Sequence, residues 1–365
     1  MCGARRLSSC PVVKIVHAAD LHIDSPIRGL ERYEGAPAAA ARLATRRALS
    51  ALADLCIAQR ASLLVLAGDL VDASAHDHKT GLFFVSEMLR LRDAGIQVFS
   101  VRGNHDAASR IVPNMLLPDN VVELGLDGPE TIVIERLGVA VHGRSYRDRA
   151  TAENLVAGYP GPIARAVNVG LLHTSADGRE GHDVYAPCTV PALREVGYDY
   201  WALGHVHAHE VLCVDPPVVF PGNLQGRSMR EQGPKGAIVV TVEGSGVVAV
   251  ELRSLDVIRF CTCEVDISEA ETLDDILDAV SRRLAMLLDG DDSEERVFAV
   301  RIVLDGVPGI GALLAHAPAR CVREIRAVAR EVGEARIWVE SVQARGRAPV
   351  SARWTMRAEL PGLWA

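Results

Sequence analysis

The chain has 365 residues, of which 49% are hydrophobic, so it is long enough to bury a large core and to form two domains. Its formal net charge of −8 excludes a general electrostatic attraction to nucleic acid or to an anionic membrane, and binding of either would need a local positive site. No apolar run approaches the roughly 20 residues that span a bilayer, so we expect no membrane segment.

The cysteines indicate the compartment. The eight cysteines are scattered along the chain and form no Cys-x-x-Cys pair. This pattern is typical of a reducing environment rather than of a disulfide framework, and we therefore expect a cytoplasmic protein. Residues 1–10 contain Arg5 and Arg6 and no apolar core, so we predict a disordered leader there rather than an export signal.

Strand-like and helix-like segments alternate through the first hundred residues. Val12 to Val16 is rich in β-branched residues and predicts a buried strand, whereas the Ala-rich segment 36–60 has apolar residues at helical spacing. A strand at 62–67, a helix at 81–93 and a strand at 96–101 are expected to follow. This alternation predicts parallel strands joined by right-handed crossovers.

From Val121 onward the expected strands are shorter and the turns tighter. Residues 131–134 and 139–142 flank a turn and predict an antiparallel pair. Further strands are expected at 167–172, 199–203 and 218–220, with a closing hairpin formed by 236–242 and 247–252. After about Leu255, the segments 259–265, 273–288, 297–304 and 335–342 predict a smaller α+β domain of roughly 100 residues. We therefore divide the chain into a leader at 1–10, a first domain at 11–255 and a second at 256–365.

Five of the expected strands end in side chains that could bind a metal ion or a proton. Because the carboxyl ends of neighbouring strands meet at one edge of a sheet, these side chains should converge. Each motif alone has an ordinary explanation as a turn or a structural histidine, but carboxylate, imidazole and amide oxygen together suit a pair of divalent transition ions. The motifs are Asp20-x-His22, Gly68-Asp69, Gly103-Asn104-His105-Asp106, His173 and Gly204-His205-Val206-His207.

This conjunction, across residues 18–207, resembles the signature of the calcineurin-like metallophosphoesterases. Within that superfamily the chain resembles the SbcD-type DNA repair nucleases, and in particular the bacterial YhaO-like exonuclease group. The stretches that carry this finer resemblance are 19–26, 200–207 and 221–227. The resemblance implies an α/β fold, a four-layered α/β/β/α sandwich, with the smaller C-terminal α+β domain capping the site.

The resemblance also implies a role for each residue. Two divalent ions, expected to be manganese, would share Asp69 as a bridging ligand. His105 would contact the scissile phosphate or the leaving oxygen, and Asp106 would orient its ring. Many SbcD-type relatives have a histidine shortly after the bridging Gly-Asp, where this chain has Asp72, so the second substrate-contacting group stays open. The first ion would be held by Asp20, His22 and His207, and the second by Asn104, His173 and His205.

The expected reaction is hydrolysis of a phosphodiester. Two ions about 3.5–4 Å apart clamp the attacking and leaving oxygens and lower the pKa of a bound water toward about 7, so metal-bound hydroxide would attack directly. We expect a manganese-dependent DNA exonuclease of DNA repair, with endonuclease capacity, an SbcC-like coiled-coil ATPase as partner, and a homodimer allowed by the same resemblance. The alternatives are a metallophosphoesterase for small or protein phosphoesters, or a non-catalytic metal-stabilised scaffold for an ATPase, which would not need His105.

Other polar residues have two interpretations each. Asp24 is either a carboxylate that orients a ligand or a cap of the following turn. Four arginines in loops expected near the site could bind DNA phosphate, or could simply be solvated: Arg28, Arg144, Arg227 and Arg230. The arginine-rich run 320–357 is interleaved with glutamates and predicts a solvated helix face. We interpret five further histidines as structural or surface residues: His76, His78, His142, His182 and His209.

Overall fold

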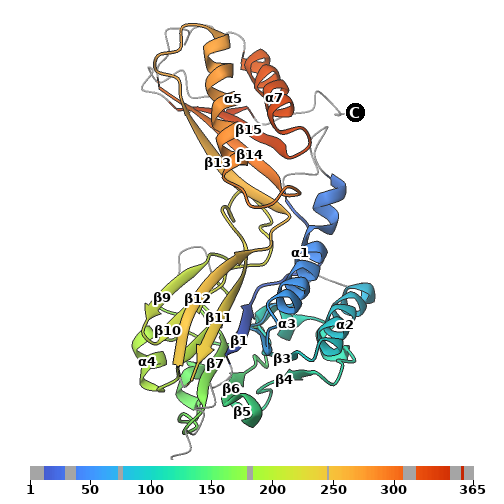
Figure 1. The fold of residues 1–365 in the computed structure, drawn as a ribbon, viewed down its shortest axis with the longest axis vertical. Helices are drawn as coiled ribbons and strands as arrows, with labels where there is room; N and C mark the ends of the chain where they lie inside the picture. The colour runs from blue at the N-terminus through green and yellow to red at the C-terminus, as the bar shows by residue number, and fades with distance from the viewer. Residues whose placement is uncertain are drawn as a thin grey trace, which may run out of the picture. The chain divides into compact units, whose positions relative to one another are not determined.

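The computed structural model describes residues 12–28, 38–72, 77–178, 184–244, 246–306, 318–345 and 355–356 (Figure 1). The expected leader at 1–10 lies outside these residues. The chain divides into two units. The first consists of Met1–Ser25, Thr45–Gln225 and Lys235–Leu255, and the second of Pro26–Ala44, Gly226–Pro234 and Asp256–Ala365. Two short segments that precede residue 256 thus group with the second unit, and nothing in the sequence predicted this.

The first unit contains two six-stranded sheets. In one, the order is β12-β11-β1-β2-β3-β4; strands β1 to β4 are parallel, and the β11–β12 hairpin joins β1 antiparallel. Both the expected parallel alternation and the closing hairpin are present. The strands are β1 (Val13–Ala18), β2 (Leu63–Leu66), β3 (Gln97–Ser100), β4 (Val121–Glu123), β11 (Gly236–Glu243) and β12 (Gly246–Ser254).

The second sheet has the order β5-β6-β7-β8-β10-β9. Its four central strands are parallel, whereas β5 and β9 are antiparallel edge strands. The β5–β6 pair is the predicted antiparallel pair, and β9 is a strand that the sequence analysis did not predict. The strands are β5 (Glu130–Ile134), β6 (Val139–Arg144), β7 (Val167–His173), β8 (Tyr200–Gly204), β9 (Glu210–Val214) and β10 (Pro217–Phe220).

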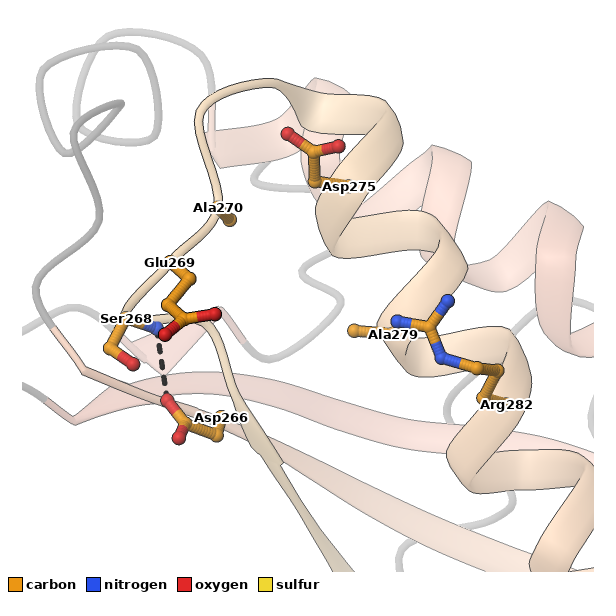
Figure 2. Close-up of a pocket in the computed structure, with 7 residues that line it drawn as sticks. All are labelled: Asp266, Ser268, Glu269, Ala270, Asp275, Ala279 and Arg282. Carbon is orange, nitrogen blue, oxygen red and sulfur yellow. Dashed lines mark hydrogen bonds between the residues drawn. The ribbon is translucent and has the colours of Figure 1, made fainter.

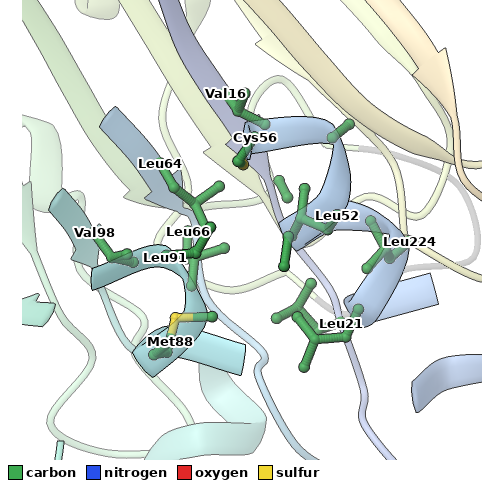
Figure 3. Close-up of a cluster of buried hydrophobic side chains, with 14 of the residues drawn as sticks. Val16, Leu21, Leu52, Cys56, Leu64, Leu66, Met88, Leu91, Val98 and Leu224 are labelled. Atoms are coloured by element: carbon green, nitrogen blue, oxygen red, sulfur yellow. The ribbon is translucent and has the colours of Figure 1, made fainter. Parts of the chain in front are cut away.

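Side chains that alternate along each strand build the layers of this unit. Leu64 and Leu66 of β2 face the helices α1 (Ala38–Ala58) and α2 (His78–Asp93), as Figure 3 shows. Leu63 and Val65 face the other way, into a core shared by both sheets. Trp201 and its neighbours cover the outer face of the second sheet, together with α4 (Val190–Glu195) and the 3-10 turn η3 (Leu155–Gly158). The predicted α/β/β/α sandwich is therefore confirmed.

Three short elements complete the first unit. They are α3 (Asn104–Ala108) and the 3-10 turns η1 (Val112–Asn114) and η2 (Glu135–Leu137). Helix α2 begins at the N-cap Asp77, whose carboxylate accepts from the Lys79 N–H, and Gly95 follows its C-cap with φ of 75°. A left-handed glycine after a C-cap is a common helix terminator.

The second unit has one sheet of order β13-β14-β15-β16. Strands β13 to β15 are parallel and β16 is antiparallel. The helices α5 and α7 bury their apolar side chains against the sheet, and Arg320 and Arg323 are exposed on α7. The solvated helix face predicted for 320–357 is confirmed only as far as Gly333, because Ile337–Arg345 and Thr355–Met356 form strands. The elements are β13 (Ile258–Asp266), α5 (Leu273–Asp289), β14 (Val297–Asp305), α7 (Pro318–Gly333), β15 (Ile337–Arg345) and β16 (Thr355–Met356).

An open depression of about 420 Å³ lies beside the start of α5 (Figure 2). Its carboxylates already serve the local backbone. Asp266 accepts from the Ser268 N–H, and Asp275 accepts from the N–H groups of Glu271 and Thr272 as part of a capping box. The acidic side chains that line the depression are therefore accounted for by a turn, at Asp266, and by the N-terminal cap of α5, at Asp275.

Two further findings concern the helices and the cysteines. Among the residues that the structure describes, none of the helices combines the length and the low polarity that a bilayer crossing requires. The cysteines within these residues are all free thiols: Cys56, Cys188, Cys213, Cys261, Cys263 and Cys321.

Candidate metal centre

The expected ligands meet where the parallel strands of both sheets end. Asp20 follows β1, Asp69 follows β2, and Asn104 begins α3 after β3. From the second sheet, His173 is the last residue of β7 and His205 follows β8 directly. All seven expected ligands belong to the first unit, and all except His207 are buried.

The backbone at this edge is strained. Asp20, His22 and Asp69 have φ values of 52°, 42° and 55°, and His205 has a φ of 106°. Residues other than glycine rarely adopt such angles, and each costs on the order of 1–3 kcal/mol. Strain of this kind persists where surrounding contacts impose it, and it is concentrated at functional sites.

One group of side chains surrounds His22. Its Nε2 lies 3.3 Å from Nε2 of His207 and 3.9 Å from Oδ2 of Asp69, and Nε2 of His207 lies 3.7 Å from Oδ1 of Asp20. Imidazole nitrogens that bind one ion at about 2.0–2.1 Å lie about 3.0–3.4 Å apart. Asp20, His22 and His207 therefore have the spacing of ligands to a common cation.

A second group surrounds His173. Its Nε2 lies 3.1 Å from Oδ1 of Asn104 and 3.5 Å from Oδ2 of Asp69, and its ring centroid lies 5.2 Å from that of His205. The Nδ1 of His173 lies 2.8 Å from the carbonyl oxygen of Ala67, which accepts its proton and leaves the Nε2 lone pair directed at Asn104 and Asp69. Such an outer hydrogen bond commonly fixes the tautomer of a metal-binding histidine. Asp69 approaches both groups, as a bridging ligand must.

Glycines allow this close approach. A Cβ added at Gly68 would lie 2.6 Å from Nδ1 of His173, and one at Gly204 would meet Nδ1 at 2.9 Å and collide with the Ala67 carbonyl. A Cβ at Gly103 would collide with Oδ1 of Asp69. The glycines of these three strand-end motifs thus make room for neighbouring side chains of the cluster.

Burying ionised carboxylates costs free energy unless a cation lies beside them. It raises the pKa of Asp69, and burial together with the neighbouring Asp69 raises the pKa of Asp106 to about 8. Among the described residues, the partners of Asp69 are the imidazoles of His22 and His173 and the backbone N–H of His105. Divalent cations would offset this cost, so carboxylates, imidazoles and amide oxygen together fit a metal pair.

His105 has a partner that the sequence analysis did not predict. Its Nδ1 lies 2.9 Å from Oδ1 of Asp72, which also lies 3.7 Å from Nδ1 of His22. The resemblance implied that Asp106 orients this ring. Instead, Asp106 accepts from the backbone N–H groups of Leu70, Val71 and Gly103, and so holds two ligand loops together.

Asp24 supports the loop that carries His22. Its carboxylate accepts two hydrogen bonds of 2.6 Å from Arg46 and one of 2.5 Å from Thr80, which tie the loop to α1 and α2. Burial alone would raise the pKa of Asp24, but these hydrogen bonds outweigh it and lower the pKa. These contacts match neither of the two interpretations, because the carboxylate of Asp24 accepts from Arg46 and Thr80 rather than from a ligand or the following turn.

The four arginines expected to bind DNA are divided between the two units. Arg144, at the end of β6, pairs with Glu153 at 2.6 Å. Arg28, Arg227 and Arg230 belong to the second unit, where the Arg28 N–H donates to the Arg227 carbonyl and the Arg227 guanidinium pairs with Glu231. Their contact with DNA stays a prediction.

The remaining histidines lie outside the cluster. His142 bridges Thr131 and Asn168, and burial lowers its pKa, while His209 lies 3.0 Å from the Phe220 carbonyl. His78 is exposed at the start of α2, whereas His76 and His182 lie outside the described residues. The contacts of His142 and His209 agree with the structural role expected from the sequence.

Two polar residues near the site escaped the sequence analysis. Lys235 is buried, and its Nζ donates to the carbonyl oxygen of His207 at 2.5 Å. His17 is fully buried and joins the two sheets through the Tyr200 hydroxyl and the Leu203 carbonyl. Neither carries a local sequence signal, because their partners lie 28 to 186 residues away.

Comparisons with known proteins agree with the resemblance inferred from the motifs. A family model described as calcineurin-like phosphoesterase matches residues 13–209, and one described as the middle domain of metallophosphoesterase YhaO matches residues 260–347. The uncharacterized metallophosphoesterase YhaO of Bacillus subtilis is 32% identical over 80% of this chain and 71% of its own length.

More distant relatives are also found. The DNA double-strand break repair protein Mre11 of Methanopyrus kandleri is 24% identical over 67% of this chain, which spans only 57% of that protein. Among solved structures, a dimetal phosphatase from Danio rerio matches 67% of this chain and 100% of its own at 10% identity, with a TM-score of 0.40. From the extent of the family match and the identity to YhaO, the chain belongs to the calcineurin-like phosphoesterase family.

Proposed function

We propose that this protein is a manganese-dependent DNA phosphodiesterase, an exonuclease of DNA repair with endonuclease capacity. The observation that carries the proposal is the cluster at the strand ends, where Asp69 approaches both His22 and His173 within 4 Å and His105 lies beside it. Two bound divalent ions would clamp the attacking and leaving oxygens and activate water. The imidazole ligands favour manganese over magnesium.

The residues of the cluster would have two roles, metal binding and proton donation. Asp20, His22 and His207 would hold the first ion, Asn104, His173 and His205 the second, and Asp69 would bridge the two. The carboxylate of Asp72 lies where it can accept the Nδ1 proton of His105 and stabilise the ring when both nitrogens are protonated. The Nε2 of this protonated ring would donate its proton to the leaving oxygen, a contribution of about 10²–10⁴-fold, and leave a neutral ring with its proton on Nδ1.

The similarity to Mre11 supports DNA as the substrate, because that relative is a DNA double-strand break repair protein. The net charge of −8 means that DNA affinity must come from the cations of the site and from local arginines. We also propose that the four loop arginines contact DNA phosphates: Arg28, Arg144, Arg227 and Arg230. We also propose that the predicted second domain, residues 256–365, which contains none of the seven ligands, selects the DNA substrate, and that an SbcC-like coiled-coil ATPase and a second copy of the chain are partners.

The test is digestion of end-labelled single-stranded and double-stranded DNA beside a small chromogenic diester. The protein is assayed with manganese, with magnesium and with a chelator. His105→Ala is the variant, and His78→Ala, an exposed histidine outside the cluster, is the matched control. We expect DNA degradation with manganese that is lost with the chelator and in His105→Ala but retained in His78→Ala.

Two results would contradict the proposal in different ways. Hydrolysis of the small diester without DNA degradation would assign the site to small or protein phosphoesters. Bound metal without hydrolysis of either substrate would indicate a metal-stabilised scaffold for an ATPase.

A further inference from the structure

An aromatic side chain lies at the margin of the metal cluster. The ring centroid of Tyr185 is 5.8 Å from that of His205, with an angle of 69° between the ring planes. Tyr185 is partly exposed, whereas His205 is buried. The tyrosine therefore offers ring surface to a molecule that sits on the ions which His205 would help to hold.

Residues that directly follow β7 hold the backbone at Tyr185 by hydrogen bonds. The carbonyl oxygen of Tyr185 accepts from the backbone N–H of Ser175 at 3.0 Å and from its hydroxyl at 2.9 Å. The next carbonyl, that of Ala186, accepts from the Thr174 hydroxyl at 2.7 Å. Thr174 and Ser175 are buried and directly follow the ligand His173, so the same strand end positions a metal ligand and the tyrosine.

This segment is also strained. Ala186 has a φ of 41°, in the left-handed region that a residue with a Cβ rarely adopts, and its N–H donates to the Thr151 carbonyl at 2.7 Å. Strained residues persist where surrounding bonds impose them, often at binding sites. Here four hydrogen bonds hold Tyr185 and Ala186 in a conformation that sets the tyrosine beside His205.

A second tyrosine provides a contrast. The ring of Tyr146 lies 5.6 Å from that of the ligand His173, also edge to face, but Tyr146 is only 1% exposed. The buried ring of Tyr146 can pack against His173, but it has no exposed surface that a ligand could contact. Of these two aromatic neighbours of the metal-site histidines within the described residues, Tyr185 is the one that can meet a substrate.

We infer that Tyr185 is a specificity-determining residue that stacks on the nucleobase next to the scissile phosphate. The inference rests on the proposed function and deepens it, because it makes the substrate a nucleotide rather than any phosphodiester. Stacking on an aromatic ring suits a nuclease with little sequence preference, since every base has a π face. It also supplies affinity without positive charge, in a protein whose net charge is −8.

The test compares two chromogenic esters that share a nitrophenolate leaving group. One is thymidine p-nitrophenyl phosphate, as the 5′ and the 3′ isomer, and the other is methyl p-nitrophenyl phosphate, which has no base. The manganese-loaded variants are Tyr185→Ala and Tyr185→Phe, with Val184→Ala as a control at a neighbouring residue that is 62% exposed.

Tyr185→Ala should raise KM for at least one thymidine ester by about 5- to 150-fold, the range of one base–aromatic stack. The kcat for that ester, and both kinetic constants for the methyl ester, should stay unchanged. Tyr185→Phe keeps the ring and should behave like the unaltered protein, as should Val184→Ala. An equal loss on both ester types, or no loss, would overturn the inference, because Tyr185 would then only support His205 or do nothing.

Inhibition separates this inference from the proposed function. Thymidine 5′- and 3′-monophosphate and inorganic phosphate are compared as inhibitors of methyl ester hydrolysis. A preference for a nucleotide over phosphate that disappears in Tyr185→Ala supports the inference, even if the protein fails to degrade DNA and the nuclease proposal falls. Equal inhibition by nucleotide and phosphate in the unaltered protein would overturn the inference, even if DNA is degraded.

Discussion

Oδ1 of Asp72 lies 2.9 Å from Nδ1 of His105, so a carboxylate just after the proposed bridging aspartate, Asp69, faces the proposed acid. Ile23 and Val71 form an isolated parallel bridge, which brings the loop that ends at Asp72 beside the loop of His22. Asp72 is thus placed to orient the ring of His105 and to stabilise its protonated form.

Asp72→Asn tests this role. An amide carries no negative charge, so it stabilises the protonated ring of His105 less than the carboxylate does. Because supporting partners of this kind typically contribute 10–100-fold, we expect kcat to fall by about that factor while the bound metal is retained. The measurement is kcat beside elemental analysis. Loss of an ion from Asp72→Asn would instead make Asp72 a metal ligand, as its position near His22 and His105 permits.

His105→Ala tests the acid itself. We expect it to keep its metal and its DNA binding and to lose about 10²–10⁴-fold in turnover on DNA. A diester with a nitrophenolate leaving group needs little protonation and should lose less. Rates on both substrates check this, and loss of metal, or no change on either, would show His105 to be a ligand or a structural residue.

Gly103→Ala tests the packing of the site. A Cβ at this position collides with Oδ1 of Asp69 and would lie 2.8 Å from Cε1 of His173. We expect weaker manganese binding and about 1–3 kcal/mol of lost stability, as for other overpacked sites. The matched control is Gly161→Ala, where an added Cβ meets no atom within 4 Å. Metal titration and chemical unfolding measure both effects, and equal behaviour of the two variants would refute the tight fit around Asp69.

His17 predicts a pH dependence of stability. Burial lowers its pKa from 6.5 to about 3, although the hydrogen bond to the Leu203 carbonyl opposes this. Because the folded protein keeps the ring neutral, its contribution is fully present above pH 6.5 and is lost as the pH falls toward 3. The slope is about 1.4 kcal/mol per pH unit.

His17→Gln keeps hydrogen-bonding groups but does not titrate. In chelator, the unfolding free energy of this variant between about pH 6 and pH 4 should fall less steeply than that of the unaltered protein, by about 1.4 kcal/mol per unit. Parallel slopes for the two proteins would mean that His17 is not held neutral.

The features that could be predicted from the sequence are those that depend on the order of the strands and helices along the chain. Parallel strands deliver their carboxyl ends to one edge, so Asp20, Asp69 and His173 could be expected to meet although they are far apart in the chain. The partner of His105 could not be predicted, since Asp72 and Asp106 are both close to the ligand loops and only side-chain directions separate them. Likewise, the link from His17 to Tyr200 spans 183 residues and has no periodic signal. The grouping of 226–234 with the second unit depends on tertiary contacts alone.

Counting the manganese ions bound per chain tests the central claim most directly. Protein loaded with manganese and freed of excess is analysed for metal, with Asp69→Asn beside it, since loss of the proposed bridging charge should weaken both sites. We expect two ions per chain in the unaltered protein and fewer in Asp69→Asn. One ion or none in the unaltered protein, or two in both, would contradict a metal pair bridged by Asp69.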